Sequence, residues 1–142
     1  MTEEKKYKQN KEENEKLLTE FKEYLTGKKL SVKTIKQHVN NLYFYLNEYL
    51  NEHNVASAKE GMGYGNISDF MGYFFIRKCM WSTPATVRST AASLKKFYTF
   101  MYEKGLVEKE DFEDFKDHMK FSIDDWCEDC AIYNGGGEYI DF

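Results

Sequence analysis

The sequence predicts an all-α fold of four to five helices, and three observations carry that prediction. Apolar residues recur at three- and four-residue spacing in several separate segments of the 142-residue chain. No alternating stretch is long enough for a convincing strand. Hydrophobic residues make up 42% of the chain, which is too many for a disordered protein. We therefore expect one helical bundle, in which short connections favour antiparallel neighbours.

The first half of the chain predicts a polar arm and two helices. Residues 1–15 carry a single large apolar side chain besides the initiator methionine, so this arm is either a frayed extension of the first helix or disordered. The first helix follows, with Gly27 at the position of a C-cap. Ser31 then offers an N-cap oxygen to a second helix that ends near Glu52. The inward stripes are Leu17, Leu18, Phe21, Tyr24 and Leu25 in the first helix, and Val32, Ile35, Val39, Leu42, Leu46 and Tyr49 in the second.

The second half predicts three more helices after a glycine-containing segment, residues 54–66, which is typical of a flexible loop. The third helix begins near Ile67 or Ser68 and ends with two basic residues, which suit the helix dipole. Pro84 marks the start of the fourth helix and Gly105 its end. The fifth spans about residues 108–119. Their inward residues are Phe70, Met71, Phe74 and Phe75, then Val87, Ala91, Leu94, Tyr98 and Met101, and finally Phe112, Phe115 and Met119.

Charge is distributed unevenly along the chain. Residues 1–104 have a net charge of +5 and residues 105–142 a net charge of −9, which together give −4 at pH 7. Such asymmetry indicates a charged partner or an internal mask. We divide the chain into a polar arm at residues 1–15, a helical domain at 16–107 and an acidic helix and tail at 108–142.

Several classes of protein are excluded by composition. No apolar run reaches 18 residues, which argues against a membrane partner, and the N-terminal residues are too charged for a signal or transit peptide. Three cysteines, an odd number, argue against a disulfide scaffold and for a reducing compartment. We therefore expect a cytoplasmic protein.

Motifs for metal or cofactor chemistry are poorly developed. Cys127 and Cys130 have metal-like spacing, but no second pair of ligands accompanies them, and incidental cysteines are the simpler interpretation. Neither glycine cluster has the context of a phosphate loop, and the acidic clusters lack the order of a calcium loop. The three histidines have no patterned partner. We expect no cofactor and no catalytic residue.

The starts of the second and fourth helices combine hydroxyl-bearing and basic side chains. Ser and Thr hydroxyls and the backbone N–H groups of a helix N-terminus suit phosphate oxygens, and Lys and Arg add charge. Judged by spacing alone, ordinary capping beside a solvated face is the simpler interpretation. The residues concerned are Ser31, Lys33, Thr34, Lys36, Gln37 and His38, and Thr83, Thr86, Arg88, Ser89, Thr90, Ser93, Lys95 and Lys96.

Four blocks of sequence add a resemblance to a known family. They are Leu18-x-x-Phe21-x-x-Tyr24-Leu25, then Ser31-x-x-Thr34 with Leu42-x-x-Tyr45-Leu46, then Ile67-x-x-Phe70, and last Ser82 with Thr86-Val87-Arg88-x-x-x-Ala92-Ser93-Leu94-Lys95-Lys96-Phe97-Tyr98-x-Phe100-Met101, closed by Lys104-Gly105-Leu106-Val107. Between Leu17 and Val107 the chain resembles the N-terminal SAM-like, core-binding domain of tyrosine recombinases and phage integrases.

This resemblance implies a four-helix orthogonal bundle whose second and fourth helices approach the major groove of duplex DNA. It implies a non-catalytic DNA-binding domain, accessory to site-specific recombination or DNA integration, that binds weakly through the groove and the phosphates. The implied DNA-binding residues are Lys33, Thr34, Lys36, Thr86, Arg88, Ser89, Lys95 and Lys96.

The chain departs from the family in its catalytic residues. A recombinase needs a second domain with two arginines, a His-x-x-Arg box and a tyrosine nucleophile. Here Arg77 and Arg88 are the only arginines, both lie in the part that resembles the DNA-binding domain, and no such box occurs. We expect no enzyme activity if the chain is complete; in a longer protein, a further domain would hold the chemistry.

The alternative function is a protein-interaction or oligomerisation module that kept the bundle and lost DNA binding. It would use the acidic residues 108–142 to dock on a basic partner, on a second copy, or on the basic face of its own chain. The aromatic side chains offered for this role are Trp126, Tyr133, Tyr139 and Phe142.

Overall fold

The computed structural model describes residues 2–79 and 81–136, and all regular structure in that part of the chain is helical. The all-α prediction is confirmed. Among the described residues, no helix is both long and apolar enough to cross a membrane. The α-helices are α1 (Glu3–Gly27), α2 (Val32–Tyr43), α3 (Glu52–Asn54), α4 (Tyr64–Asp69), α5 (Phe75–Lys78), α6 (Pro84–Glu103) and α7 (Lys109–Ala131).

Two segments of π-helix join neighbouring α-helices into longer rods. Phe44–Asn51 continues α2 into α3, and Phe70–Phe74 continues α4 into α5. The second predicted helix therefore exists as one rod and ends at Asn54, after which Val55 adopts a left-handed conformation. The third begins at Tyr64, three or four residues before the predicted start near Ile67 or Ser68.

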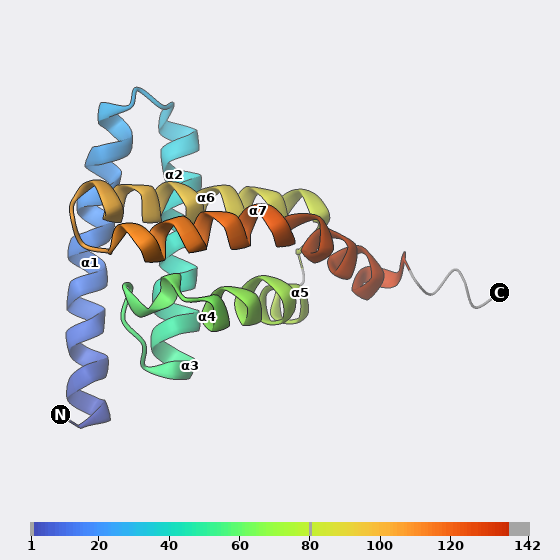
Figure 1. Cartoon of the computed structure of the whole chain (residues 1–142), viewed down its shortest axis with the longest axis horizontal. Coiled ribbons are helices and arrows are strands. Elements are labelled where there is room, and N and C mark those ends of the chain that lie inside the picture. Colours follow the sequence, from blue (N-terminus) through green and yellow to red (C-terminus); the bar gives the residue numbers. More distant parts are fainter. Residues whose placement is uncertain (1, 80, 137–142) are drawn as a thin grey trace.

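The helices form two crossing pairs. α1 and α2 make one hairpin, and α6 and α7 make a second pair that runs across it, while α4 and α5 lie beside the lower part of the hairpin (Figure 1). One apolar core spans all of these elements. Aromatic rings fill much of it: Phe21 meets Phe97 edge-on at 5.3 Å, and Phe70 lies 4.6 Å from the Tyr45 ring, both distances between ring centroids.

Local sequence signals explain where the helices begin. The side chain of Ser31 caps α2 by accepting from Thr34 N at 3.2 Å. Thr83 and Thr86 form a reciprocal capping box on either side of Pro84, which lies in the first turn of α6. One residue of the predicted inward stripe is misplaced: Val32 is 83% exposed, because it opens α2 at the end of the hairpin, where polar side chains of α1 cover little of it.

The polar arm is helical and belongs to α1. Its buried side chains are asparagines rather than apolar residues. Asn10 Nδ2 donates to Asn51 Oδ1 at 3.0 Å, and Asn14 Nδ2 donates to Asn47 Oδ1 at 2.9 Å. These hydrogen bonds dock the first half of α1 on the π-helical part of the α2–α3 rod, so of the two alternatives for residues 1–15 the helical extension is correct over 3–15.

The predicted fifth helix is much longer than residues 108–119. α7 continues to Ala131, and its second half packs on the core with Trp126, Cys127 and Cys130 all buried. Its first half buries Phe112, Phe115 and Met119, as predicted. α7 therefore shares the apolar core of the preceding helices instead of trailing from it.

The predicted flexible loop is a packed segment. Two buried tyrosine hydroxyls donate to its backbone, Tyr98 to the carbonyl oxygen of Ala58 at 2.7 Å and Tyr45 to that of Gly61. Gly61 is buried, and a Cβ there would lie 2.3 Å from Leu50 Cδ1. This glycine is present because the backbone passes too close to the core for a side chain, which corrects the interpretation from sequence.

Candidate nucleic-acid interface

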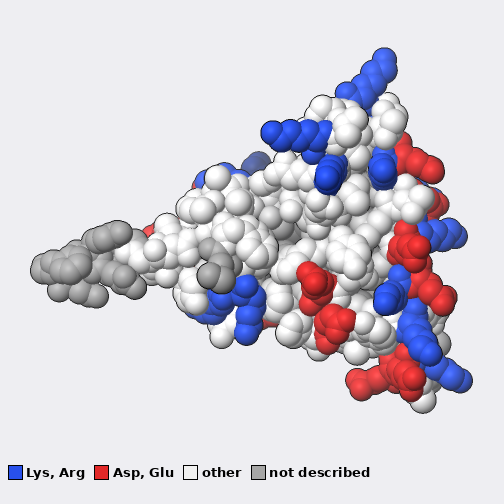
Figure 2. Space-filling model, turned by 180° about the vertical axis from the view of Figure 1, so that it is seen from behind, with Lys and Arg blue, Asp and Glu red and all other residues white. Residues whose placement is uncertain are grey.

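Lysine side chains gather where α1 turns into α2. Residues 21–40 contain five lysines and a single glutamate, and the adjoining side of α6 adds two more lysines. Figure 2, which views one face from behind, shows several basic side chains projecting from the end of the molecule at which the hairpin turns. We call this set the basic end; it consists of Lys22, Lys28, Lys29, Lys33, Lys36, Lys95 and Lys96.

Five of the seven lysines of the basic end line two hollows near the turn. Lys28, Lys95 and Lys96 line one of about 390 Å³, and Lys22 and Lys36 line another of about 360 Å³ between α1 and α2. No lysine of this set forms an ion pair within the described residues, whereas Lys6, Lys104 and Lys116 each lie within ion-pair distance of a glutamate. The basic end therefore keeps its positive charge available to an anionic partner.

Polar side chains fix the contact between α2 and α6. Gln37 Nε2 donates to Ser89 Oγ at 2.8 Å. Ser93 Oγ accepts from Asn41 Nδ2 at 2.9 Å and shares a hydrogen bond of 2.7 Å with His38 Nδ1. The two helix starts singled out in the sequence thus belong to elements that touch, but Ser89 serves to join them.

The predicted threonines also have structural partners. Thr34 Oγ1 accepts from Ser31 Oγ at 2.8 Å, and Thr86 Oγ1 accepts from Thr83 N at 2.7 Å. Both lie in the first turn of a helix and complete its cap. Hydroxyls engaged in this way contribute less to an external phosphate than the lysines beside them.

Arg88 is held by the acidic helix. Its Nη2 atom lies 2.8 Å from Asp124 Oδ1 of α7, and this contact raises the pKa of the guanidinium. Both side chains are largely exposed, so solvent screens the pair and it adds little to the stability of the fold. Among the eight predicted residues, Arg88 is the one that the structure pairs with a carboxylate.

The eight predicted residues therefore do not form one continuous face. Lys95 and Lys96 lie with Lys28, Lys36 lies in the other hollow, and Arg88 turns to α7. The prediction omitted Lys22, Lys28 and Lys29, because it considered helix starts and not the end of the preceding helix. A local count of charge over residues 21–40 would have found them.

One buried histidine, His38, and one partly buried histidine, His118, make stability depend on pH. Desolvation lowers the pKa of His38 and His118 below the unfolded-state value of about 6.5, and Lys96 lowers that of His38 further. The unfolded chain therefore takes up protons first as the pH falls. Their contribution to stability is complete well above the unfolded-state pKa of about 6.5 and is lost as the pH falls through that value.

We expect the free energy of unfolding, measured in urea, to fall between about pH 7.5 and pH 5.5. The His38→Gln variant should show a smaller fall over the same range. An unchanged pH dependence in this variant would contradict the assignment.

The two cysteines with metal-like spacing act as core residues. Cys127 Sγ lies 3.6 Å from the carbonyl oxygen of Pro84, and Cys130 Sγ lies 3.7 Å from Asn134 Nδ2. Burial raises the pKa of the Cys127 thiol, which makes it a poorer ligand and nucleophile. Within residues 2–79 and 81–136, no group of three or more His, Cys, Asp or Glu side chains is placed to hold a metal ion.

The aromatic residues predicted to mediate protein interaction differ in their exposure. Trp126 lies in the core and presents no interaction surface, which corrects that part of the alternative. Tyr133 is half exposed and its ring centroid lies 5.1 Å from Arg77 Cζ. Tyr139 and Phe142 lie outside the described residues. Comparisons with family models, with curated proteins and with solved structures found no match to this chain.

Proposed function

We propose that the chain is a non-catalytic module that binds duplex DNA through its basic end. The observation that carries the proposal is the set of seven lysines around the α1–α2 turn and the adjoining side of α6, none of which forms an ion pair with a described residue. Lysines in such a cluster neutralise phosphates and release condensed counterions, which gives affinity without sequence preference.

The contact between α2 and α6 supports binding to several phosphates of one duplex at once. The two helices are joined by hydrogen bonds from Gln37 and Asn41, so the lysines they carry are held on one rigid support. The resemblance of residues 17–107 to integrase core-binding domains makes an accessory part in DNA recombination or integration the biological context we propose. Arg88 joins such an interface only when it leaves Asp124.

A charge-matched pair of variants tests the proposal. We expect the triple variant Lys28→Gln, Lys33→Gln, Lys96→Gln to bind random duplex DNA at least about tenfold more weakly at low salt, because about three phosphate contacts are lost. The logarithmic salt slope should become shallower by about 2 to 3. Fluorescence anisotropy with a labelled duplex measures both quantities.

The control is the variant Lys8→Gln, Lys11→Gln, Lys16→Gln, which removes the same charge from exposed positions on the first half of α1. It should retain most of the affinity. Equal losses in both variants would mean that only net charge matters, and absence of binding by the unaltered chain at about 50 mM salt would reject DNA as the partner.

One observation favours the alternative, an interaction module. Phe121 on α7 is 88% exposed and lies on a helix rich in carboxylates. This second function predicts self-association of the chain in sedimentation equilibrium and no DNA binding in the anisotropy titration.

A further inference from the structure

A cavity of about 660 Å³ lies between residues 59–64 and α7. Its size is within the range of small-molecule sites. The cavity is formed by elements other than those of the basic end, so the inference does not rest on the proposed DNA binding.

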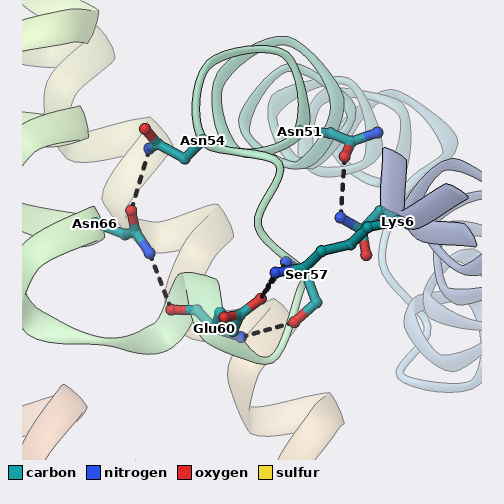
Figure 3. Close-up of polar contacts among 7 residues, drawn as sticks. Lys6, Asn51, Asn54, Ser57, Glu60 and Asn66 are labelled. Atoms are coloured by element: carbon teal, nitrogen blue, oxygen red, sulfur yellow. Dashed lines mark hydrogen bonds and ion pairs between the residues drawn. The ribbon is translucent and has the colours of Figure 1, made fainter. Parts of the chain in front are cut away.

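One wall of the cavity is held rigidly from behind. Ser57 N donates to Glu60 Oε1 at 2.9 Å, and Glu60 N donates to Ser57 Oγ at 3.2 Å. Asn66 Nδ2 donates to the carbonyl oxygen of Glu60 at 3.1 Å, and Lys6 approaches the Glu60 carboxylate from α1 (Figure 3). A wall fixed in this way needs little reorganisation on binding.

The floor of the cavity is apolar, and its edge is aromatic. Met62, Val107 and Phe115 are buried and form the floor. The Tyr64 ring, largely exposed, lies over the His118 ring with 4.2 Å between the centroids and an interplanar angle of 32°. Such a lining suits the aliphatic stem and flat face of an organic ligand.

The charge of the lining is negative. Three carboxylates face a single ammonium, that of Lys59. Glu60 is already engaged by Ser57 and Lys6, and Asp111 lies in the first turn of α7, where the helix dipole stabilises it. Asp114, one turn further, forms no ion pair within the described residues.

His118 adds a buried nitrogen with no partner. Its Nε2 atom lies 3.1 Å from Ser68 Oγ, whereas Nδ1 has no hydrogen-bond partner in the described part of the chain. Desolvation lowers the pKa of His118, so the ring is neutral near pH 7 and Nδ1 is able to accept when Nε2 carries the proton. Nδ1 is closed off from solvent, so His118 lines the cavity through its ring and not through this nitrogen.

We propose that this cavity binds a guanidinium group on an aliphatic stem. A guanidinium is planar, stacks on aromatic rings such as Tyr64, and donates in a fork to carboxylates such as Asp114. A compact ammonium matches the carboxylates but not the aromatic edge. The group belongs either to a free small molecule or to an arginine of a partner protein.

The experiment is an NMR titration of the full ¹⁵N-labelled chain with N-acetylarginine methylamide. We expect saturable shifts of the amides of residues 59–64 and 111–118, with a Kd of about 1 mM or tighter. The citrulline analogue, neutral and of nearly equal shape, should give no saturable shift. Equal response to both ligands, or no saturation with arginine, overturns the proposal.

Two variants locate the interaction. Asp114→Asn should raise the Kd about tenfold, because it removes one charge-assisted hydrogen bond. Asp117→Asn changes the same charge on the same helix but outside the cavity lining, and it should leave the Kd within about twofold. Equal effects of the two variants would place binding elsewhere and reject the site.

A second titration separates the two sources of the group. The pentapeptide Gly-Gly-Arg-Gly-Gly presents the side chain within a polypeptide. Binding of the peptide at least as tight as that of the amide supports an arginine of a partner protein, and binding of the amide alone supports a free small molecule. Failure of both contradicts the inference, whatever the outcome with DNA.

Discussion

Replacement of Trp126 by alanine should lower the free energy of unfolding by about 3 to 5 kcal/mol. Trp126 is 5% exposed and packs against Gly72, where an added Cβ would lie 3.2 Å from the indole. It also meets the His118 ring edge-on at 5.5 Å. Alanine leaves a cavity where α7 contacts the rod of α4 and α5, and neighbouring helices can close it only in part.

The control for this variant is Phe121→Ala, an aromatic truncation on the same helix at an exposed position. It should change stability by less than about 0.5 kcal/mol. Chemical denaturation followed by circular dichroism measures both. A small effect of Trp126→Ala would mean that the second half of α7 is not part of the cooperative fold.

The acidic residues 108–142 cannot be removed without loss of core side chains. Deletion of residues 121–142 removes Trp126, Cys127 and Cys130 from the core together with the carboxylates. A change in DNA binding after this deletion could then come from loss of the fold or from removal of the acidic residues, and the experiment would not separate the two causes. The variant Asp124→Asn removes the negative charge beside Arg88 and leaves the core intact, so it is the cleaner probe of an internal mask.

Replacement of Gly61 by alanine should destabilise the protein by about 3 kcal/mol. The added Cβ would lie 2.3 Å from Leu50 Cδ1 and 2.7 Å from the Tyr98 hydroxyl oxygen. Leu50 is fully buried, and the Tyr98 hydroxyl is anchored on Ala58. Neither can move without disturbing its own neighbours, so the strain spreads into the core.

Gly65→Ala provides the comparison. Gly65 lies in α4 with open space around the position of a Cβ, and alanine there should be neutral or stabilising by up to about 1 kcal/mol. Thermal unfolding of the two variants side by side gives the difference. Similar melting temperatures would contradict the close approach of the backbone at Gly61.

Apolar periodicity was a sound guide where a helix buries apolar side chains along its length. The inward residues predicted for α6, from Val87 to Met101, are all buried. It failed for the first half of α1, because Asn10 and Asn14 dock there through hydrogen bonds that no hydropathy pattern reveals. It failed for Val32 because periodicity does not tell where the facing helix ends.

The candidate sites were predictable only in part. Lysine clustering over residues 21–40 is visible in the sequence, but the proximity of Lys28 to Lys95 and Lys96 depends on how α6 crosses the hairpin. The guanidinium cavity was not predictable at all. It brings residues 59–64 against α7, and the pairing of Tyr64 with His118 spans a separation that no local pattern encodes.

The buried asparagines of α1 fix the register of this helix against the α2–α3 rod. Purely apolar faces of two helices can slide past each other by a turn at modest cost, because one methyl group replaces another. A buried amide that loses its partner costs about 1 to 3 kcal/mol, so Asn10 and Asn14 penalise every shifted pairing with Asn51 and Asn47. The register of α1 is thus chosen by two amide pairs, in the way that a buried asparagine sets the register of a coiled coil.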